Sequence, residues 1–258
     1  MARYPILLLL LTLPVAQPRA GIVEGERAFL AGDYEFAASE LLPLVAGNVL
    51  AAYYLGVMNL DTQWTKRNAE LGTQWLTIAA HRGHTGAQRR LALAYEHGDV
   101  VERDYRVAAQ WMLEAARGGN ADAQYYVGRY YRNGQGVIQD DAQAVEWIHR
   151  SVEYDISHDR LLDALLYLGA AYEWGRGRAQ NLTEAYKWFS LASSYSTDDA
   201  TMRDEAALAL DALRIRMSPT QLAEAGERAE AWRMEKEQMY GSYYAGSAAR
   251  SLPWRSSP

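Results

Sequence analysis

The side chains able to carry out covalent or metal chemistry are few in this sequence of 258 residues. The chain contains no cysteine, which excludes a thiol nucleophile, a zinc-thiolate site and a disulfide. His81 and His84 are the closest histidines, but Gly83 lies between them in an expected loop and no fuller ligand set accompanies them. We therefore interpret both as solvated loop histidines and expect neither a metal ion nor a cofactor.

Sequence motifs of enzymes are also missing. None of the three lysines follows a serine by three residues, and the chain has neither a G-x-S-x-G elbow nor an H-E-x-x-H zinc helix. The pair Gly134 and Gly136 recurs as Gly175 and Gly177 without the Lys-Ser/Thr of a phosphate-binding loop. Repetition favours a role in ending helices, so the sequence predicts a protein without catalytic activity.

A regular spacing of large and small residues indicates which elements make up the chain. Trp75, Trp111 and Trp147 recur every 36 residues, and Trp188 follows after 41. Small residues repeat at the same intervals, at Ala51, Ala87, Ala123 and Ala164, and at Gly56, Ala92, Gly128 and Gly169. Such a period is typical of stacked helix pairs, in which the tryptophans fill the core and the glycines allow close helix approach. The longer last interval predicts an insertion in a loop.

Each copy contains two helical patterns joined by a short turn. The apolar residues of the segment DDAQAVEWIHRSV recur three and four positions apart, as on one face of a helix. Asp104, Asp140 and Asn181 stand where these second helices should begin, and their side chains are suited to capping the first turn. The glycine pairs before Asp140 and Asn181 favour the left-handed conformation at the end of the first helix.

Two segments, 121–151 and 165–193, resemble the Sel-one-like repeat (SLR) family of tetratricopeptide-related solenoids. Both contain Ala, Leu-Gly or Val-Gly, Tyr, Gly-x-Gly, Asp or Asn, Ala and Trp in the family's order. The first copy departs from the pattern at residues 62–64, where Thr-Gln-Trp replaces the glycine turn, and the second departs at Val100. The resemblance implies an all-α, right-handed α-solenoid of about four helix pairs with capping helices at both ends.

The expected organisation has five parts. They are a signal peptide at 1–20, an N-terminal helix pair at 21–47, four repeats at 48–197, C-terminal capping helices at 198–236 and a flexible tail at 237–258. Ser218, Pro219 and Gln221 form a helix-start signature for the last capping helix.

The first twenty residues have the features of a secretory leader. Arg3 precedes an apolar run at 6–13, and Ala16 and Ala20 offer small residues after which cleavage is expected. The run is too short for a membrane-spanning helix, so no stable membrane span is expected after cleavage. We expect a periplasmic or secreted protein; the alternative is a cytoplasmic adaptor that retains this segment.

The surface expected to bind a partner lies on the first helices of the repeats. Resemblance to tetratricopeptide-like solenoids implies that these helices line a concave face. Candidate side chains are Tyr53, Arg89, Glu96, His97, Tyr125, Arg129, Arg132, Asn133 and Trp174. Tyrosine and arginine are enriched where proteins bind one another, whereas a net charge of −6 disfavours nucleic acid.

These features predict a non-enzymatic, exported scaffold or adaptor that contacts an unidentified envelope protein or peptide. The resemblance also keeps open an alternative, an enzyme or binding protein that acts on cell-wall or β-lactam-like ligands. The secreted relatives stabilised by disulfides depend on cysteines that this chain lacks.

Overall fold

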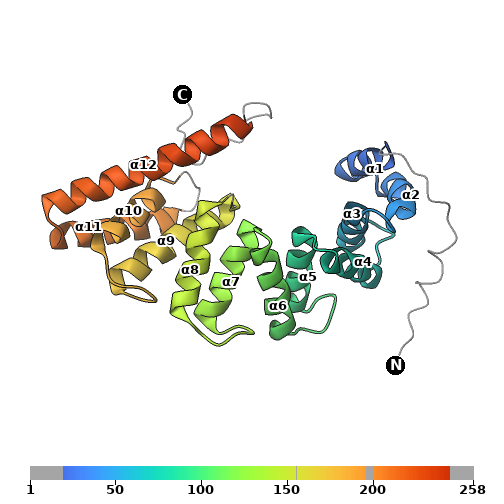
Figure 1. Cartoon of the computed structure of the whole chain (residues 1–258), viewed down its shortest axis with the longest axis horizontal. Coiled ribbons are helices and arrows are strands. Elements are labelled where there is room, and N and C mark those ends of the chain that lie inside the picture. The colour runs from blue at the N-terminus through green and yellow to red at the C-terminus, as the bar shows by residue number, and fades with distance from the viewer. Residues whose placement is uncertain (1–19, 155, 196–199, 245–258) are drawn as a thin grey trace. The chain divides into compact units, whose positions relative to one another are not determined.

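The computed structural model describes residues 20–154, 156–195 and 200–244, and throughout these ranges the regular structure is helical (Figure 1). The chain divides into two compact units, one ending at Asn120 and the other beginning at Ala121. Residues 1–19 of the leader predicted at 1–20 and the residues after 244 lie outside the described part of the chain. Within the described ranges, no helix combines the length and apolar character needed to cross a bilayer.

The first unit contains six α-helices and one short 3₁₀ helix among its described residues. They are α1 (Ala20–Leu30), α2 (Tyr34–Leu41), η2 (Leu42–Leu44), α3 (Val49–Leu60), α4 (Ala69–His81), α5 (Thr85–His97) and α6 (Tyr105–Arg117). Helices α1 and α2, α3 and α4, and α5 and α6 pack as successive hairpins. A core that includes Leu41, Leu55, Leu76 and Leu91 joins these pairs.

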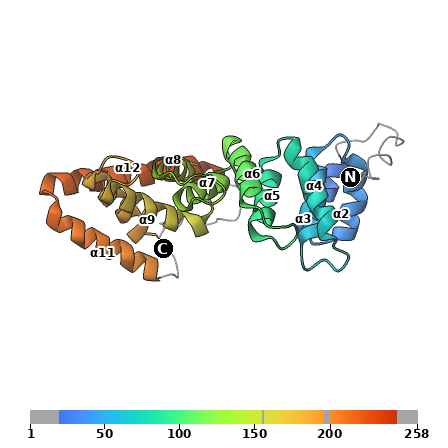
Figure 2. The ribbon, with the colours of Figure 1, turned by 90° about the horizontal axis from the view of Figure 1, so that it is seen from below.

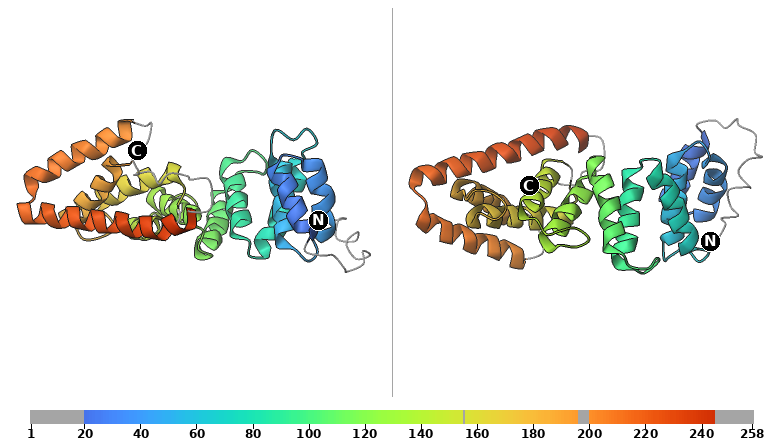
Figure 3. Two further views of the ribbon diagram at one scale, coloured as in Figure 1. Left: turned by 90° about the horizontal axis from the view of Figure 1, so that it is seen from above. Right: turned by 60° about the horizontal axis from the view of Figure 1, so that its bottom comes forward.

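The second unit begins with two further hairpins, α7 with α8 and α9 with α10. Its helices are α7 (Ala121–Asn133), α8 (Asp141–Glu153), α9 (His158–Trp174), α10 (Leu182–Ser193), α11 (Ala200–Arg216) and α12 (Pro219–Tyr244). Helices α11 and α12 both pack chiefly on α10 rather than on each other, and they diverge on either side of it (Figures 2 and 3).

The predicted helix starts are confirmed by their capping hydrogen bonds. Asp140 accepts from the backbone N–H of Gln143 at 3.0 Å, and Asn181 accepts from that of Glu184 at 3.1 Å. Asp104 caps α6 in the same way. Because these side chains satisfy amides that have no partner inside the helix, they fix where each second helix begins.

The predicted close approach of paired helices is confirmed at the repeated glycines. A methyl group on Gly56 would lie 2.7 Å from the side chain of Leu76, and one on Gly169 would lie 2.7 Å from the ring of Phe189. Gly134 and Gly175 adopt the left-handed conformation, with φ of 67° and 68°, directly after α7 and α9. The glycines therefore set both the spacing of each hairpin and its turn.

The first repeat forms its turn without glycines. Asp61 follows α3 in an extended conformation and accepts a hydrogen bond from the hydroxyl of Tyr34 on α2. The ring of Trp64 then packs edge-on against that of Tyr34, with centroids 5.8 Å apart. Contacts with the N-terminal helix pair thus hold the turn that glycines hold elsewhere.

The C-terminal helix is longer than the sequence indicated. Ser218 and Gln221 form the predicted reciprocal cap, with N···O distances of 2.9 and 3.3 Å. Helix α12 then continues to Tyr244, past residue 237, where a flexible tail was expected. No proline stands among residues 237–244 to break the helix.

Candidate binding surface

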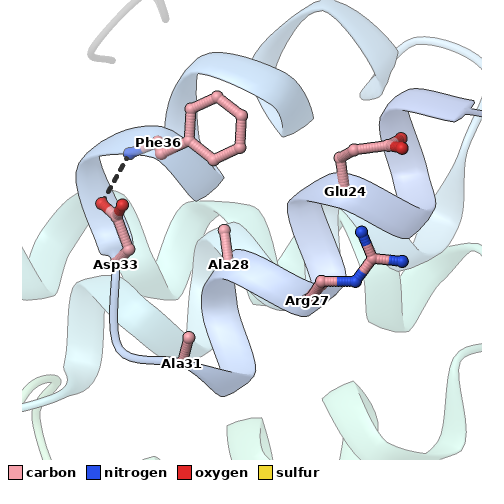
Figure 4. A pocket seen from close by; sticks show the side chains of 6 residues that line it. All are labelled: Glu24, Arg27, Ala28, Ala31, Asp33 and Phe36. Atoms are coloured by element: carbon pink, nitrogen blue, oxygen red, sulfur yellow. Dashed lines mark hydrogen bonds between the residues drawn. The ribbon is translucent and has the colours of Figure 1, made fainter.

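Two hollows lie on the surface of the described residues. One hollow of about 220 Å³ lies between α1 and α2, where Glu24, Arg27 and Phe36 face it (Figure 4). The carboxylate of Asp33 at its edge is engaged in capping, because it accepts from the backbone N–H of Phe36 at 3.1 Å. A second hollow of about 490 Å³ lies beside the turn before α8, next to the exposed Ile138.

The interpretation of the two neighbouring histidines as solvated loop residues was wrong for His84, which is half-buried, whereas His81 is exposed as predicted but belongs to a helix. His81 belongs to the last turn of α4, and its ring packs edge-on to Trp111 with centroids 5.0 Å apart. His84 caps α5 by accepting from the backbone N–H of Ala87 at 3.1 Å, while burial lowers the pKa of its imidazole. Over the part of the chain that the structure describes, no three His, Asp or Glu side chains are grouped to hold a metal ion.

In the first unit, the candidate side chains lie on α3 and α5. Tyr53 is half-buried, stacks on His84 with ring centroids 4.2 Å apart, and accepts a hydrogen bond from Arg90 Nε at 3.4 Å. Arg89 and Glu96 are half-buried on α5, and His97 is exposed at its end. Tyr53 is therefore packed against His84 and Arg90, and only part of its side chain is accessible to a partner.

In the second unit, Tyr125 does not project to solvent as expected. Its side chain is only 7% exposed, and its hydroxyl donates to Asp163 Oδ2 on α9 at 2.6 Å. Burial, followed by the hydrogen bond to Asp163, raises the pKa of the phenol, so it stays neutral. Tyr125 joins α7 to α9 and belongs to the core.

The neighbouring Tyr126 takes the position on the surface. It is half-buried, and the guanidinium carbon of Arg129 lies 5.4 Å from its ring centroid. One helical turn farther, Arg132 lies 5.2 Å from the ring centroid of Tyr167 on α9, and its Nε donates to Asn133 Oδ1 at 3.4 Å. The structure thus places Arg129 and Arg132 on two tyrosine rings that were not predicted from the sequence, with Asn133 beside Arg132.

Arg160 completes this cluster from α9. Its guanidinium lies 5.1 Å from the ring of Tyr126 and donates to the Tyr126 hydroxyl at 3.2 Å. It also pairs with Asp122 at 3.6 Å, and Asp122 accepts from the backbone N–H and the hydroxyl of Ser157 at 2.9 and 2.6 Å. We define the Tyr/Arg face as Tyr126, Arg129, Arg132, Arg160 and Tyr167.

Trp174 lies apart from these contacts, at the end of α9. Its side chain is 63% exposed, and the guanidinium carbon of Arg216 on α11 lies 5.9 Å from its ring centroid. Arg216 also forms an ion pair of 2.5 Å with the buried Glu173. A flat aromatic surface is thereby held in place at the edge of the unit.

A second cluster of charged groups, also missed from the sequence, attaches α12 to the unit. Lys236 is 2% exposed, and its Nζ donates to the backbone oxygen of Glu153 at 2.5 Å. The Glu153 carboxylate accepts from Trp232 Nε1 at 3.2 Å and lies 3.4 Å from Lys236 Nζ. Because all these groups are satisfied by one another, we assign them to holding the helix and not to chemistry.

Comparison with known proteins identifies the repeats. The sequence model described as "Sel1 repeat" matches residues 49–84, 85–120, 121–153 and 162–194, more than half of the chain. No curated protein matches it significantly.

Two solved structures are similar in fold. A Sel1 repeat protein from Oxalobacter formigenes has a TM-score of 0.60 at 21% identity, over 84% of this chain and 99% of that one. A protective antigen with an SLR fold from uropathogenic Escherichia coli has a TM-score of 0.51 at 18% identity, over 92% of this chain and 58% of the antigen. The present chain thus spans little more than half of the antigen's length. The predicted all-α solenoid class is confirmed.

Proposed function

Because the chain belongs to the Sel1 repeat family, we propose that it is a non-enzymatic scaffold that binds another protein through the first helices of its repeats. The family repeat supports a role in protein–protein interaction. A solenoid spreads many modest contacts over stacked helices, so affinity does not require a reactive centre.

The observation that carries the proposal is the Tyr/Arg face on α7 and α9. Tyr126 and Tyr167 are half-buried, so their rings are held in place while part of each remains accessible. Tyrosine and arginine offer large rigid surfaces and several hydrogen-bond donors, and they dominate interaction hot spots. We place the principal contact here and a lesser one at the exposed ring of Trp174.

Crosslinking in the native cell tests this assignment. We expect Tyr126→Ala/Tyr167→Ala to lower the yield of the crosslinked partner by at least about tenfold, the scale of losing a hot-spot tyrosine. The matched control is Tyr154→Ala, which removes a 58% exposed tyrosine from the same unit. Equal capture by wild type and the double variant would reject the face. Turnover of a peptidoglycan fragment by the purified protein would reject the non-enzymatic role.

We further propose that the protein acts in the periplasm or outside the cell. The support is the order of the first twenty residues, a basic start followed by a short apolar run and small residues. Mass spectrometry of the protein from its native cell should find an N-terminus directly after Ala16 or Ala20. Recovery of a chain that still begins at Met1 would contradict export with cleavage.

A further inference from the structure

The arginines of the Tyr/Arg face differ in how their charge is balanced. Arg160 pairs with Asp122, whereas Arg129 and Arg132 form no ion pair with any carboxylate whose side chain the structure describes. The neighbouring Asp163 accepts a hydrogen bond from the hydroxyl of Tyr125 and keeps its negative charge. Neither arginine is thus paired with a carboxylate of the described side chains, while Asp163 and Asp141 act electrostatically on the same tyrosines as these arginines, Tyr125 and Tyr167.

The tyrosine rings keep these two guanidinium groups in place. Arg129 lies over Tyr126 of its own helix, and Arg132 reaches across to Tyr167 of α9. A guanidinium that rests on an aromatic face loses little further freedom on binding, while its edge keeps N–H donors for an anion. Contact with the ring also removes part of its water, which strengthens attraction to an opposite charge.

From this arrangement we infer that the Tyr/Arg face binds an acidic, extended segment of a protein partner. The inference rests on the proposed scaffold function and names the chemistry of what is bound. Residues three apart on a helix have Cβ atoms about 5–6 Å from each other. Carboxylates two residues apart in an extended peptide are separated by about 6.6 Å, so a Glu-x-Glu pattern matches Arg129 and Arg132.

A peptide-binding measurement tests the inference directly. Fluorescein-labelled dodecapeptides of alternating Glu and Ser, or of alternating Lys and Ser, are titrated with the purified protein while anisotropy is recorded. We expect saturable binding of the Glu-Ser peptide alone, weakened as salt rises from about 50 to 300 mM because exposed charges are screened. Arg129→Glu/Arg132→Glu should weaken it by at least about tenfold and favour the Lys-Ser peptide.

The matched control is Arg150→Glu on α8. Arg150 also lies over an aromatic ring, that of Trp147, but it pairs with Glu146 at 2.9 Å and is outside the Tyr/Arg face. This substitution should change affinity by less than about twofold. Should charge reversal on α7 lower helicity, Arg129→Gln/Arg132→Gln gives the same comparison without added negative charge.

Failure of the inference can be told apart from failure of the proposed function. Absence of Glu-Ser binding, or equal binding by wild type and the Arg129/Arg132 variants, overturns the acidic ligand. If the crosslinked partner in cells is then lost with Tyr126→Ala/Tyr167→Ala but kept with the arginine variants, the scaffold function stands with a different ligand chemistry. If neither pair of substitutions alters capture, both proposals fail.

Discussion

Gly169 lies where α9 and α10 approach too closely for a larger side chain. A Cβ there would lie 2.7 Å from the buried ring of Phe189, so Gly169→Ala forces one of the two helices to shift. We expect a loss of about 1–3 kcal/mol in the free energy of unfolding, measured by urea denaturation. Gly226→Ala on α12 is the control: its Cβ would meet nothing within 4 Å, so improved helix propensity should stabilise the protein slightly. Equal effects would contradict the packing argument.

His149 gives the stability a dependence on pH. Burial lowers the pKa of its imidazole from 6.5; Glu153 and Glu146 oppose this shift, while Arg178 and Lys187 add to it. The unfolded chain therefore takes up a proton before the folded chain does. The stability that comes from keeping His149 neutral in the folded chain is fully present above pH 6.5. It is lost as the pH falls through the pKa of His149 in the folded state.

Urea denaturation at pH 7.5 and 5.5 tests this sign. Wild type should be less stable at pH 5.5 than at pH 7.5, and His149→Gln should reduce this difference in stability. Part of the difference should persist in the variant, because burial also lowers the pKa of His84. A difference that is unchanged by His149→Gln would assign the pH dependence to other groups.

The sequence predicted Tyr125 on the binding surface, whereas the neighbouring Tyr126 occupies that position. The repeat spacing aligned Tyr125 with Tyr53 and Arg89, but period alone does not tell which of two adjacent tyrosines faces the core. The choice depends on Asp163, 38 residues away, to which Tyr125 donates its hydrogen bond. Likewise, Arg132 meets Tyr167 only because α7 and α9 lie side by side.

At the scale of elements, the buried Lys236 is one of the polar anchors of α12, beside the hydrogen bond from Trp232 to Glu153 and the ion pair of Arg228 with Glu184. Lys236→Ala removes the hydrogen bonds to the backbone oxygen and the carboxylate of Glu153. We expect a loss of about 1.5–3 kcal/mol in the free energy of unfolding, together with faster proteolysis within α12. Lys66→Ala is the matched control, since its ion pair with Glu35 is about two-thirds exposed and contributes little. A cost at Lys236 no greater than that at Lys66 would show that the other contacts of α12 hold it without the lysine.

Short-range signals explain why the helices of the repeats were predicted and the position of α12 was not. Caps and turn glycines lie within a few residues of the helix ends that they determine, as at Asn181 and Gly175. The contact between Lys236 and Glu153 joins residues 83 positions apart and follows no repeat period. Sequence spacing therefore predicted the hairpins but could not indicate where the terminal helix would pack.

At the scale of the whole molecule, the chain divides into two compact units. We therefore expect a destabilising substitution in one unit to leave the free-energy cost of a substitution in the other unchanged. Gly56 contacts Leu76 in the first unit, and Gly169 contacts Phe189 in the second, so the two substitutions to alanine share no partner. In repeat proteins, stability is approximately a sum of repeat and nearest-neighbour terms. The double variant should therefore lose the sum of the two single losses, within about 0.5 kcal/mol.

A double-mutant cycle monitored by circular dichroism and tryptophan fluorescence measures this coupling. Both Gly→Ala sites lie beside tryptophan-containing helices, Trp75 on α4 and Trp188 on α10, so fluorescence reports on each unit. A coupling energy well above 0.5 kcal/mol would mean that the two sites interact energetically, which would contradict the independence of the units. Additivity would mean that each repeat hairpin is stabilised by its own neighbours, as the local packing of α3 on α4 and α9 on α10 requires.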